Sequence, residues 1–168
     1  NNLATIERRL GNFAEAKRLL DFTIEIKKNI YEPGHKELAI SYGNLALVEK
    51  DLGNISQARD IQRLALEIGE KIYEPNNTFL ITGYSNFAFL EAKLGNLEEA
   101  KQLYEKVIDI QKNIVEPNYF DLASNYNELA NIEYDLKDLE SARCSYKLAI
   151  EMLEKIPDFN NIELGVFY

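Results

Sequence analysis

The stretch NLALVEKDLGNISQA at residues 44–58 contains the pattern that decides the fold. Its Leu-Gly-Asn triplet begins at Leu52 and occurs again at Leu10 and at Leu94, a spacing of 42 residues each time. Other residues repeat at the same spacing: Leu3-Ala4, Leu45-Ala46, Phe87-Ala88 and Leu129-Ala130; Ala16, Ala58, Ala100 and Ala142; Tyr42, Tyr84, Tyr126 and Tyr168. A fixed period of this length indicates a repeat protein, and the 168 residues hold four periods.

Each period predicts two helices joined by a tight turn. In the second period, spacings of three and four residues predict one apolar helical face, made of Leu38, Tyr42, Leu45, Val48 and Leu52. Gly53 should end this helix because glycine adopts a left-handed C-cap without steric cost, and Asn54 is placed to cap the next helix. That second helix should end at Glu74-Pro75, since proline disfavours helix in the residue before it.

A single pair of such helices cannot bury its apolar faces, so successive pairs must stack on one another. We therefore expect an all-α solenoid of antiparallel helix pairs, with about four 42-residue repeats. The expected repeats are about 1–34, 35–76, 77–118 and 119–160, followed by the start of a further helix at 161–168. Together, residues 1–168 should form a single repeat domain, which we interpret as a fragment of a longer array.

The composition is that of a chain that folds around a core, with 46% hydrophobic and 28% charged residues. The net charge of −9 disfavours a general binder of nucleic acid or of anionic membranes, because both need a basic face. No apolar run approaches the roughly 18 residues that a membrane span requires. The single cysteine, Cys144, excludes an internal disulfide and indicates a reducing compartment, so we expect a cytoplasmic protein.

The sequence contains none of the motifs that bind nucleotides or metals through a fixed spacing: GxGxxG, GxxxxGK[ST], HExxH, CxxC and the EF-hand loop are missing. The single histidine, His35, is interpreted as a loop or helix-start residue and not as a catalytic base, because no nucleophile recurs near it. Cys144 is interpreted as a surface thiol. We therefore expect no enzymatic activity within these residues, no metal and no cofactor.

Carboxylates and cations also repeat with the period. The carboxylates are Glu7, Glu49, Glu91 and Glu133, and the cations one residue after each small alanine are Lys17, Arg59, Lys101 and Arg143. If the two helices of a repeat pair across their turn, Glu49 lies near Arg59, which predicts an ion pair within each repeat. The alternative is an acidic stripe that binds a cationic ligand. We favour the ion pairs, which would enforce the register of the helices.

The spacing of Asn44-Leu45-Ala46, Gly53-Asn54 and Ala58 resembles the tetratricopeptide repeat. The 42-residue interval and Ala65-Leu66-Glu67-Ile68 resemble its long-repeat variety, found in kinesin light chains and many bacterial regulators. This resemblance covers the whole chain and implies a right-handed superhelical solenoid whose concave wall is lined by the first helix of each repeat. The peptide-binding groove that it implies contains Asn2, Thr5, Arg8, Asn44, Leu47, Lys50, Asn86, Phe89, Asn127, Asn131 and Tyr134.

Asparagine suits such a groove because its amide can donate to a peptide carbonyl and accept from a peptide N–H at once. Leu47 and Phe89 would supply an apolar pocket, which usually carries most of the affinity. A basic start of the groove, at Arg8, Arg9 and Lys50, would favour an acidic segment at that end. Without the resemblance, the asparagines would be interpreted as the solvated face of an amphipathic helix.

The expected function is that of a scaffold that holds a protein or peptide segment in the concave groove. The alternative is a ligand-sensing regulatory module that controls an attached effector domain, in which binding would change the dimensions of the molecule. Uncovered helix faces at the two ends of the array further predict end-to-end self-association through truncated repeats. No nucleic-acid or membrane partner is expected.

Overall fold

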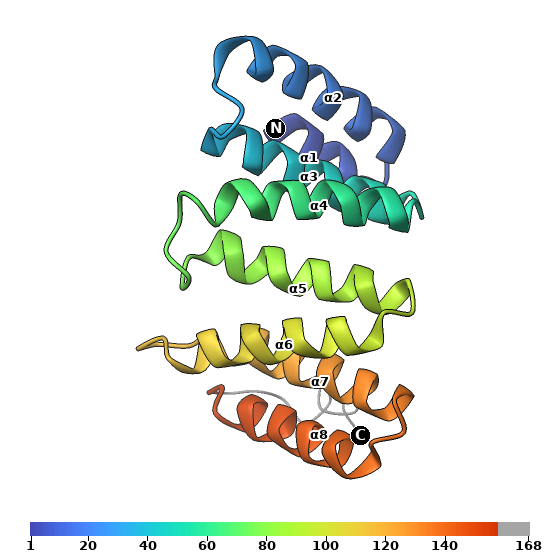
Figure 1. The fold of residues 1–168 in the computed structure, drawn as a ribbon, viewed down its shortest axis with the longest axis vertical. Coiled ribbons are helices and arrows are strands. Elements are labelled where there is room, and N and C mark those ends of the chain that lie inside the picture. The colour runs from blue at the N-terminus through green and yellow to red at the C-terminus, as the bar shows by residue number, and fades with distance from the viewer. Residues whose placement is uncertain (158–168) are drawn as a thin grey trace. The chain divides into compact units, whose positions relative to one another are not determined.

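The computed structural model describes residues 1–157, and these contain eight α-helices and no β-strand (Figure 1). The helices are α1 (Asn2–Arg9), α2 (Phe13–Ile30), α3 (Lys36–Asp51), α4 (Ile55–Gly69), α5 (Thr78–Lys93), α6 (Leu97–Lys112), α7 (Tyr119–Asp135) and α8 (Leu139–Glu154). The helix expected to start at 161–168 lies outside the described residues. None of the eight helices is both long enough and apolar enough to cross a membrane.

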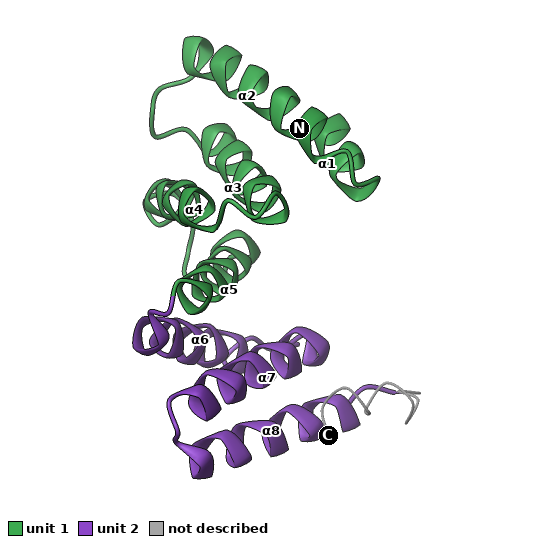
Figure 2. Ribbon diagram, turned by 90° about the vertical axis from the view of Figure 1, so that its right-hand side faces the viewer, with its two compact units in different colours: residues 1–94 green, residues 95–168 purple. Residues whose placement is uncertain are grey.

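The chain forms two compact units (Figure 2). Unit 1 comprises Asn1–Leu94 and contains α1 to α5, while unit 2 comprises Gly95–Tyr168 and contains α6 to α8. Within unit 1, α3 packs against both α2 and α4, and α4 also packs against α5. Within unit 2, α7 packs against both α6 and α8. Inside each unit, helices that follow one another in sequence thus cover each other's apolar faces, as the stacking argument requires.

The tight turns end their helices as the sequence predicts. Gly53 has a φ of +83°, and Gly11 and Gly95 have φ values of +82° and +86°. After α3, the backbone N–H groups of Gly53 and Asn54 donate to the carbonyls of Lys50 and Glu49, both at 2.9 Å, which closes a Schellman turn. In the fourth period Lys137 occupies the glycine position with a φ of 68°, a conformation that costs a side-chain-bearing residue about 1–2 kcal/mol.

The asparagine after the glycine behaves differently from the prediction. Asn54 occupies the N-cap position of α4, but its side chain makes no capping hydrogen bond. Its Nδ2 instead donates to Glu49 Oε2 at 2.7 Å, and Asn12 Nδ2 donates to Glu7 Oε2 at the same distance. The asparagine side chain therefore binds the helix that has just ended, because a hydrogen bond to a charged carboxylate is stronger than one between neutral groups.

The three helices that follow the longer loops have side-chain caps, and among the helices that follow a tight turn α8 is capped by Asp138, whose Oδ1 accepts from the backbone N–H of Ser141 at 3.2 Å. His35 Nδ1 accepts from the backbone N–H of Glu37 at 3.2 Å, and Asn77 Oδ1 accepts from that of Phe79 at 2.9 Å. Asn118 Oδ1 does the same for Phe120 at 3.1 Å. The interpretation of His35 as a helix-start residue is therefore confirmed, and its ring also stacks on Tyr31 with centroids 4.2 Å apart.

The core is built from the repeating apolar positions. In unit 1 one cluster joins α1, α2 and α3 through Ala4, Ala16, Leu20, Ile24, Leu45 and Val48. The small alanine of each period is buried, as expected for a position where two helices approach closely: Ala16, Ala58, Ala100 and Ala142. Leucine and alanine at fixed positions thus form both the contact within a helix pair and the contact to the next pair.

Two glycines, Gly69 and Gly83, allow an especially close approach of α4 and α5. A Cβ atom on Gly69 would lie 2.6 Å from Phe79 Cε1, and one on Gly83 would lie 2.7 Å from Leu66 Cδ2. Both separations are shorter than any ordinary carbon contact, so a larger residue at either position requires the neighbouring side chain or the helix itself to shift. This close seam was not predicted from the sequence, because neither glycine recurs at the 42-residue spacing.

Candidate functional site

A cavity of about 230 Å³ in unit 1 contains part of the predicted groove. It brings together Asn44 and Leu47 from α3 with Asn86 from α5. Asn44 and Asn86 stand 42 residues apart, so the same position of successive repeats faces one space. The other lining residues are Ile40, Gly43, Gln62, Thr78, Phe79, Thr82 and Gly83.

The lining includes residues that the sequence did not single out. Gln62 comes from α4 and is buried, and its Nε2 donates to the carbonyl of Gly83 at 3.3 Å. This hydrogen bond leaves the Gln62 carbonyl oxygen as an acceptor beside the cavity. A signal for it was present: at the same position of the other periods stand Leu20, Tyr104 and Tyr146, so a polar amide interrupts an otherwise bulky, mainly apolar column.

A cationic patch lies beside this cavity, at the C-terminal ends of α3 and α5. The ammonium groups of Lys50 and Lys93 each lie 5.3 Å from the ring centroid of Phe89, which is within the range of a cation–π interaction. Burial lowers the pKa of Lys50, whose side chain is half-buried. Of the two other predicted cations of the early groove, Arg9 is exposed and Arg8 is ion-paired with Asp51.

The predicted residues of α1 lie near a second, more open hollow of about 540 Å³. Asn2 lines it together with Asn44, and Asn1, Lys27, Glu37 and Ile40 complete its wall. Thr5 does not line this hollow, and its hydroxyl donates to the carbonyl of Asn1 at 3.2 Å. Asn44 therefore lines both of these hollows, and Asn2 lines the more open one with it.

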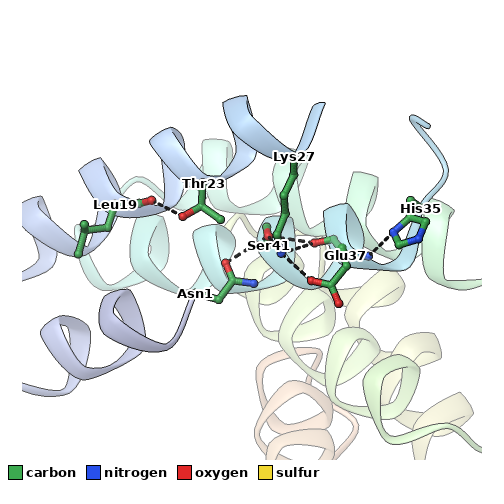
Figure 3. A network of polar contacts seen from close by, with 7 residues as sticks. All are labelled: Asn1, Leu19, Thr23, Lys27, His35, Glu37 and Ser41. Carbon is green, nitrogen blue, oxygen red and sulfur yellow. Dashed lines mark hydrogen bonds and ion pairs between the residues drawn. The ribbon is translucent and has the colours of Figure 1, made fainter. Parts of the chain in front are cut away.

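A buried serine beside a lysine forms the centre of a polar network at the wall of this hollow (Figure 3). Lys27 Nζ donates to Ser41 Oγ at 3.0 Å, to Glu37 Oε2 at 2.7 Å and to the Glu37 carbonyl at 3.1 Å. A serine–lysine pair can be a nucleophile and its base. Here the Lys27 ammonium donates to three acceptors, so its nitrogen has no free lone pair to accept a proton from Ser41. The Ser41 hydroxyl donates instead to the Glu37 carbonyl at 2.9 Å. The arrangement therefore holds α2 to α3 and does not activate the serine.

Unit 2 carries the remaining predicted groove residues, Asn127, Asn131 and Tyr134, on α7. The hydroxyl of Tyr146 on α8 donates to Asn131 Oδ1 at 2.6 Å, so this amide is partly occupied. Tyr134 is exposed, and Lys137 Nζ lies 5.6 Å from its ring centroid. The pKa of Tyr146 is raised, first by burial and then by nearby carboxylates that include Asp135 and Glu128. This stretch of α7 is thus acidic where its counterpart in unit 1 is basic.

The repeating carboxylates pair with cations, but not with the partners that were predicted. The observed ion pairs are Lys17–Glu49 at 2.6 Å, Arg59–Glu91 at 3.6 Å and Lys101–Glu133 at 3.2 Å. Each joins the second helix of one repeat to the first helix of the next, so the predicted pairing of Glu49 with Arg59 within a repeat is wrong. Glu7 accepts a hydrogen bond from Asn12, and Arg143 pairs with Glu140 on its own helix.

Geometry explains the error. The first helix of a repeat turns its glutamate toward the preceding helix pair, where the cation of the previous repeat lies. Glu49, Glu91 and Glu133 are only 0%, 1% and 4% exposed. The alternative of an acidic stripe for a cationic ligand is therefore excluded for these three. The interaction of its ammonium with the Glu49 carboxylate raises the pKa of Lys17, so Lys17 stays charged.

A family model described as Tetratricopeptide repeat matches residues 1–71 and 79–155. The chain belongs to the tetratricopeptide repeat family. Tetratricopeptide repeats generally mediate binding between proteins. No curated protein sequence matches the chain significantly.

Solved structures of tetratricopeptide repeats have the same fold. BtubC (BKLC) from P. vanneervenii superposes with a TM-score of 0.86 over 94% of this chain at 19% identity, and the chain spans 63% of the length of BtubC. A putative kinesin light chain from Podosopora anserina with nearly identical repeats gives a TM-score of 0.76 over 98% of this chain and 78% of that one, at 20% identity. A second crystal structure of that putative kinesin light chain, a single-substitution variant, gives a TM-score of 0.73. It covers 92% of this chain and 69% of the variant, at 21% identity. The predicted fold class, an all-α solenoid of helix pairs, is confirmed.

The residues considered for chemistry have structural positions in these tetratricopeptide repeats. His35 caps a helix, and Cys144 is an exposed free thiol on α8. Among residues 1–157, no three His, Cys, Asp or Glu side chains come together in a way that could hold a metal ion.

Proposed function

We propose that this chain binds an extended polypeptide segment along the first helices of its repeats, with the principal contact at the 230 Å³ cavity of unit 1. One observation carries the proposal: Asn44 and Asn86, equivalent residues of successive repeats, line the same cavity. A peptide backbone presents donors and acceptors at regular intervals, and a row of amides can bond to it whatever its side chains are.

The rest of the cavity supports the same proposal. Leu47, Phe79 and Ile40 supply apolar contact area, which would anchor one bulky side chain of the segment. The free carbonyl oxygen of Gln62 adds an acceptor from below. A cavity of this size suits one side chain of a longer ligand better than it suits a whole drug-sized molecule.

The charged side chains near the cavity predict which residues the proposed segment carries. Lys50 and Lys93 flank Phe89, and Arg9 is an exposed cation on α1, whereas Arg8 is already paired with Asp51. The segment should therefore carry acidic residues where it passes the two lysines. In unit 2, taken by itself, the α7 stretch with Glu128, Asp135 and Tyr134 would instead favour a neutral or basic ligand. Such complementarity affects the rate of association and the choice of partner more than the affinity itself.

The test is a selection from a phage-displayed library of random dodecapeptides against the purified chain. Selected peptides are then measured by fluorescence anisotropy with the wild type, with Asn44→Ala/Asn86→Ala, and with Asn29→Ala as a matched control. Asn29 is an exposed asparagine on α2 that lines neither hollow. We expect the double variant to bind at least tenfold more weakly, a loss of about 1.4 kcal/mol, with an unchanged melting temperature. Equal binding by the wild type and the double variant would refute the assignment of the groove.

A further inference from the structure

A different cavity, of about 440 Å³, lies on unit 1 away from the groove. It is enclosed by the C-terminal part of α2, the loop that follows it, the start of α3 and the C-terminal half of α4. Its lining has no residue in common with the groove cavity: Lys28, Tyr31, Pro33, Gly34, Leu38, Tyr42, Leu64, Glu67, Ile68 and Lys71. Its volume is in the range of sites that take small molecules, roughly 300–1,000 Å³.

The cavity combines an apolar floor with a rim of hydrogen-bond donors. Leu38 and Ile68 are buried and form the floor. Tyr31 and Tyr42 are half-buried, and neither hydroxyl has a hydrogen-bond partner among residues 1–157. At the mouth the ammonium of Lys28 lies 5.9 Å from the ring centroid of Tyr42.

The charges of the rim do not cancel. Besides Lys28 the rim carries the ammonium of Lys71, and neither lysine is ion-paired within the described part of the chain. Glu67 is the lone carboxylate among the ten lining residues. Two ammonium groups and two phenol hydroxyls therefore face one acceptor, and a ligand that supplies hydrogen-bond acceptors and negative charge would complete the set.

The next repeat provides an internal comparison for this site. Tyr73, Pro75, Leu80 and Tyr84 stand one period after their counterparts in the cavity, but Lys28 is replaced by Glu70. There the hydroxyl of Tyr84 donates to Glu70 Oε1 at 2.6 Å, and Tyr84 is only 6% exposed. The chain thus provides a carboxylate acceptor for Tyr84, but at the equivalent position beside Tyr42 it has a lysine. Lysine cannot accept a hydrogen bond, so the Tyr42 hydroxyl keeps its proton for another acceptor.

We propose that the cavity of Tyr31, Tyr42, Lys28 and Lys71 binds a small carboxylic acid with an apolar body. The carboxylate occupies the position that Glu70 holds in the next repeat, where it accepts from Tyr42 and lies beside the two ammonium groups. The apolar body packs on Leu38 and Ile68. A free small acid is favoured over a peptide because three helices and a loop enclose the site, which leaves little path for a continuing backbone.

The first experiment measures binding of 3-phenylpropionate and of its neutral analogue 3-phenylpropionamide to the full chain, from backbone amide chemical shifts in NMR spectra. We expect 3-phenylpropionate to shift the resonance of the Gly34 backbone amide, with a dissociation constant in the millimolar range. 3-Phenylpropionamide should bind at least tenfold more weakly. Equal binding of the two probes, or acid-induced shifts centred on Asn44 and Asn86, would overturn the proposal.

The second experiment copies the arrangement of the next repeat with Lys28→Glu. The new carboxylate should accept from Tyr42 as Glu70 does from Tyr84, so the fold and the melting temperature are kept while binding of 3-phenylpropionate is lost. Lys112→Glu is the matched control, a charge reversal in the last turn of α6, and should bind the acid like the wild type. Retained binding by Lys28→Glu would contradict the proposal, as would equal loss in both variants.

A third measurement, with a short peptide, distinguishes a free small acid from a carboxylate side chain of a polypeptide partner. If an N-acetylated Phe-Glu-Ala-Ala peptide amide shifted the same resonances at a concentration more than tenfold lower than 3-phenylpropionate, the site would belong to a polypeptide partner and the small-acid assignment would be wrong. Binding of the free acid alone supports the proposal. Because this cavity and the groove have no lining residue in common, its test is independent of the groove variants.

Discussion

The carboxylate of Glu49 connects three segments of unit 1 at the scale of a single residue. One oxygen lies 2.6 Å from Lys17 Nζ on α2, and the other accepts from Asn54 Nδ2 in the turn after α3. The carboxylate is fully buried, while Lys17 retains about a third of its exposure. An ionised group in such a position is tolerated because one oxygen accepts a hydrogen bond and the other lies against the ammonium of Lys17.

Glu49→Gln should destabilise the protein. The amide keeps the shape of the side chain but leaves Lys17 without a counter-charge and offers Asn54 a weaker acceptor, so we expect the free energy of unfolding to fall by about 2 kcal/mol. Urea denaturation followed by circular dichroism at 222 nm measures this. Glu15→Gln is the control, because the Glu15–Arg18 pair is exposed and lies within one helix. A Glu49→Gln variant as stable as the control would show that the buried pair adds no stability.

The residue scale also shows the limit of a periodic argument. The 42-residue spacing identified Glu49, Glu91 and Glu133 as one column, and their burial agrees with a structural role. It could not identify the partner of each, because equivalent positions look the same whether a contact lies within a repeat or across to the next one. The side chain of Asn54 was misjudged for a similar reason: its capping preference was known, but the acceptor one turn back was not considered.

At the scale of helices, the seam between α4 and α5 depends on the absence of two Cβ atoms. Gly83 lies against Leu66 and Gln62, and Gly69 lies against Phe79 and Leu80. Because Gln62 and Phe79 also line the groove cavity, the closeness of these helices positions part of the candidate site. The packing that positions these two residues is thus part of the packing that holds unit 1 together.

Gly83→Ala should force this seam apart. Its Cβ would meet Leu66 Cδ2 at 2.7 Å and Gln62 Nε2 at 3.2 Å, so overpacking should outweigh the gain in helix propensity and cost a net of about 1–2 kcal/mol. The control is Gly43→Ala on α3, where the nearest atom, Phe79 Cε2, would lie at an ordinary 3.7 Å. That variant should be neutral or more stable by up to about 1 kcal/mol. Thermal unfolding measures the stability of the two variants. Equal stability of Gly83→Ala and Gly43→Ala would contradict the close packing of α4 against α5.

At the scale of the whole molecule, repeat proteins are expected to be stabilised by contacts between neighbouring repeats. The Lys17–Glu49 pair lies in unit 1 and the Lys101–Glu133 pair lies in unit 2, and the two carboxylates have no partner in common. In unit 2 the second oxygen of Glu133 accepts from Ser145 Oγ at 2.7 Å in place of the asparagine amide. The same interface is therefore built twice with different supporting residues.

The effects of removing these two carboxylates should add. For Glu49→Gln combined with Glu133→Gln, the loss in free energy of unfolding should equal the sum of the single losses to within about 0.5 kcal/mol. Urea denaturation of the wild type, both single variants and the double variant forms the required cycle. A larger deviation would mean that the two interfaces do not act independently.

Much of the fold could be predicted from the sequence because the residues that determine the turns and the helix contacts occur again in each period. The Leu-Gly-Asn turns, the buried alanines and the apolar helical faces all occur where the spacing predicts them. The candidate groove was accessible only in part: Asn44, Leu47 and Asn86 line one cavity, whereas Gln62 and Phe79 were missed. The missed residues belong to no repeating column of their own type, and only their three-dimensional neighbours show that they face the same space.

The double attachment of Glu49 has a mechanical consequence. The carboxylate that supports the turn between α3 and α4 also lies against Lys17 on α2, so a pulling force that separates α2 from α3 removes the counter-ion of that carboxylate. Under load the anchors would give way one repeat at a time, and each rupture would free a whole hairpin at once. An optical-tweezers trace of this protein should accordingly rise and fall in a sawtooth rather than stretch smoothly.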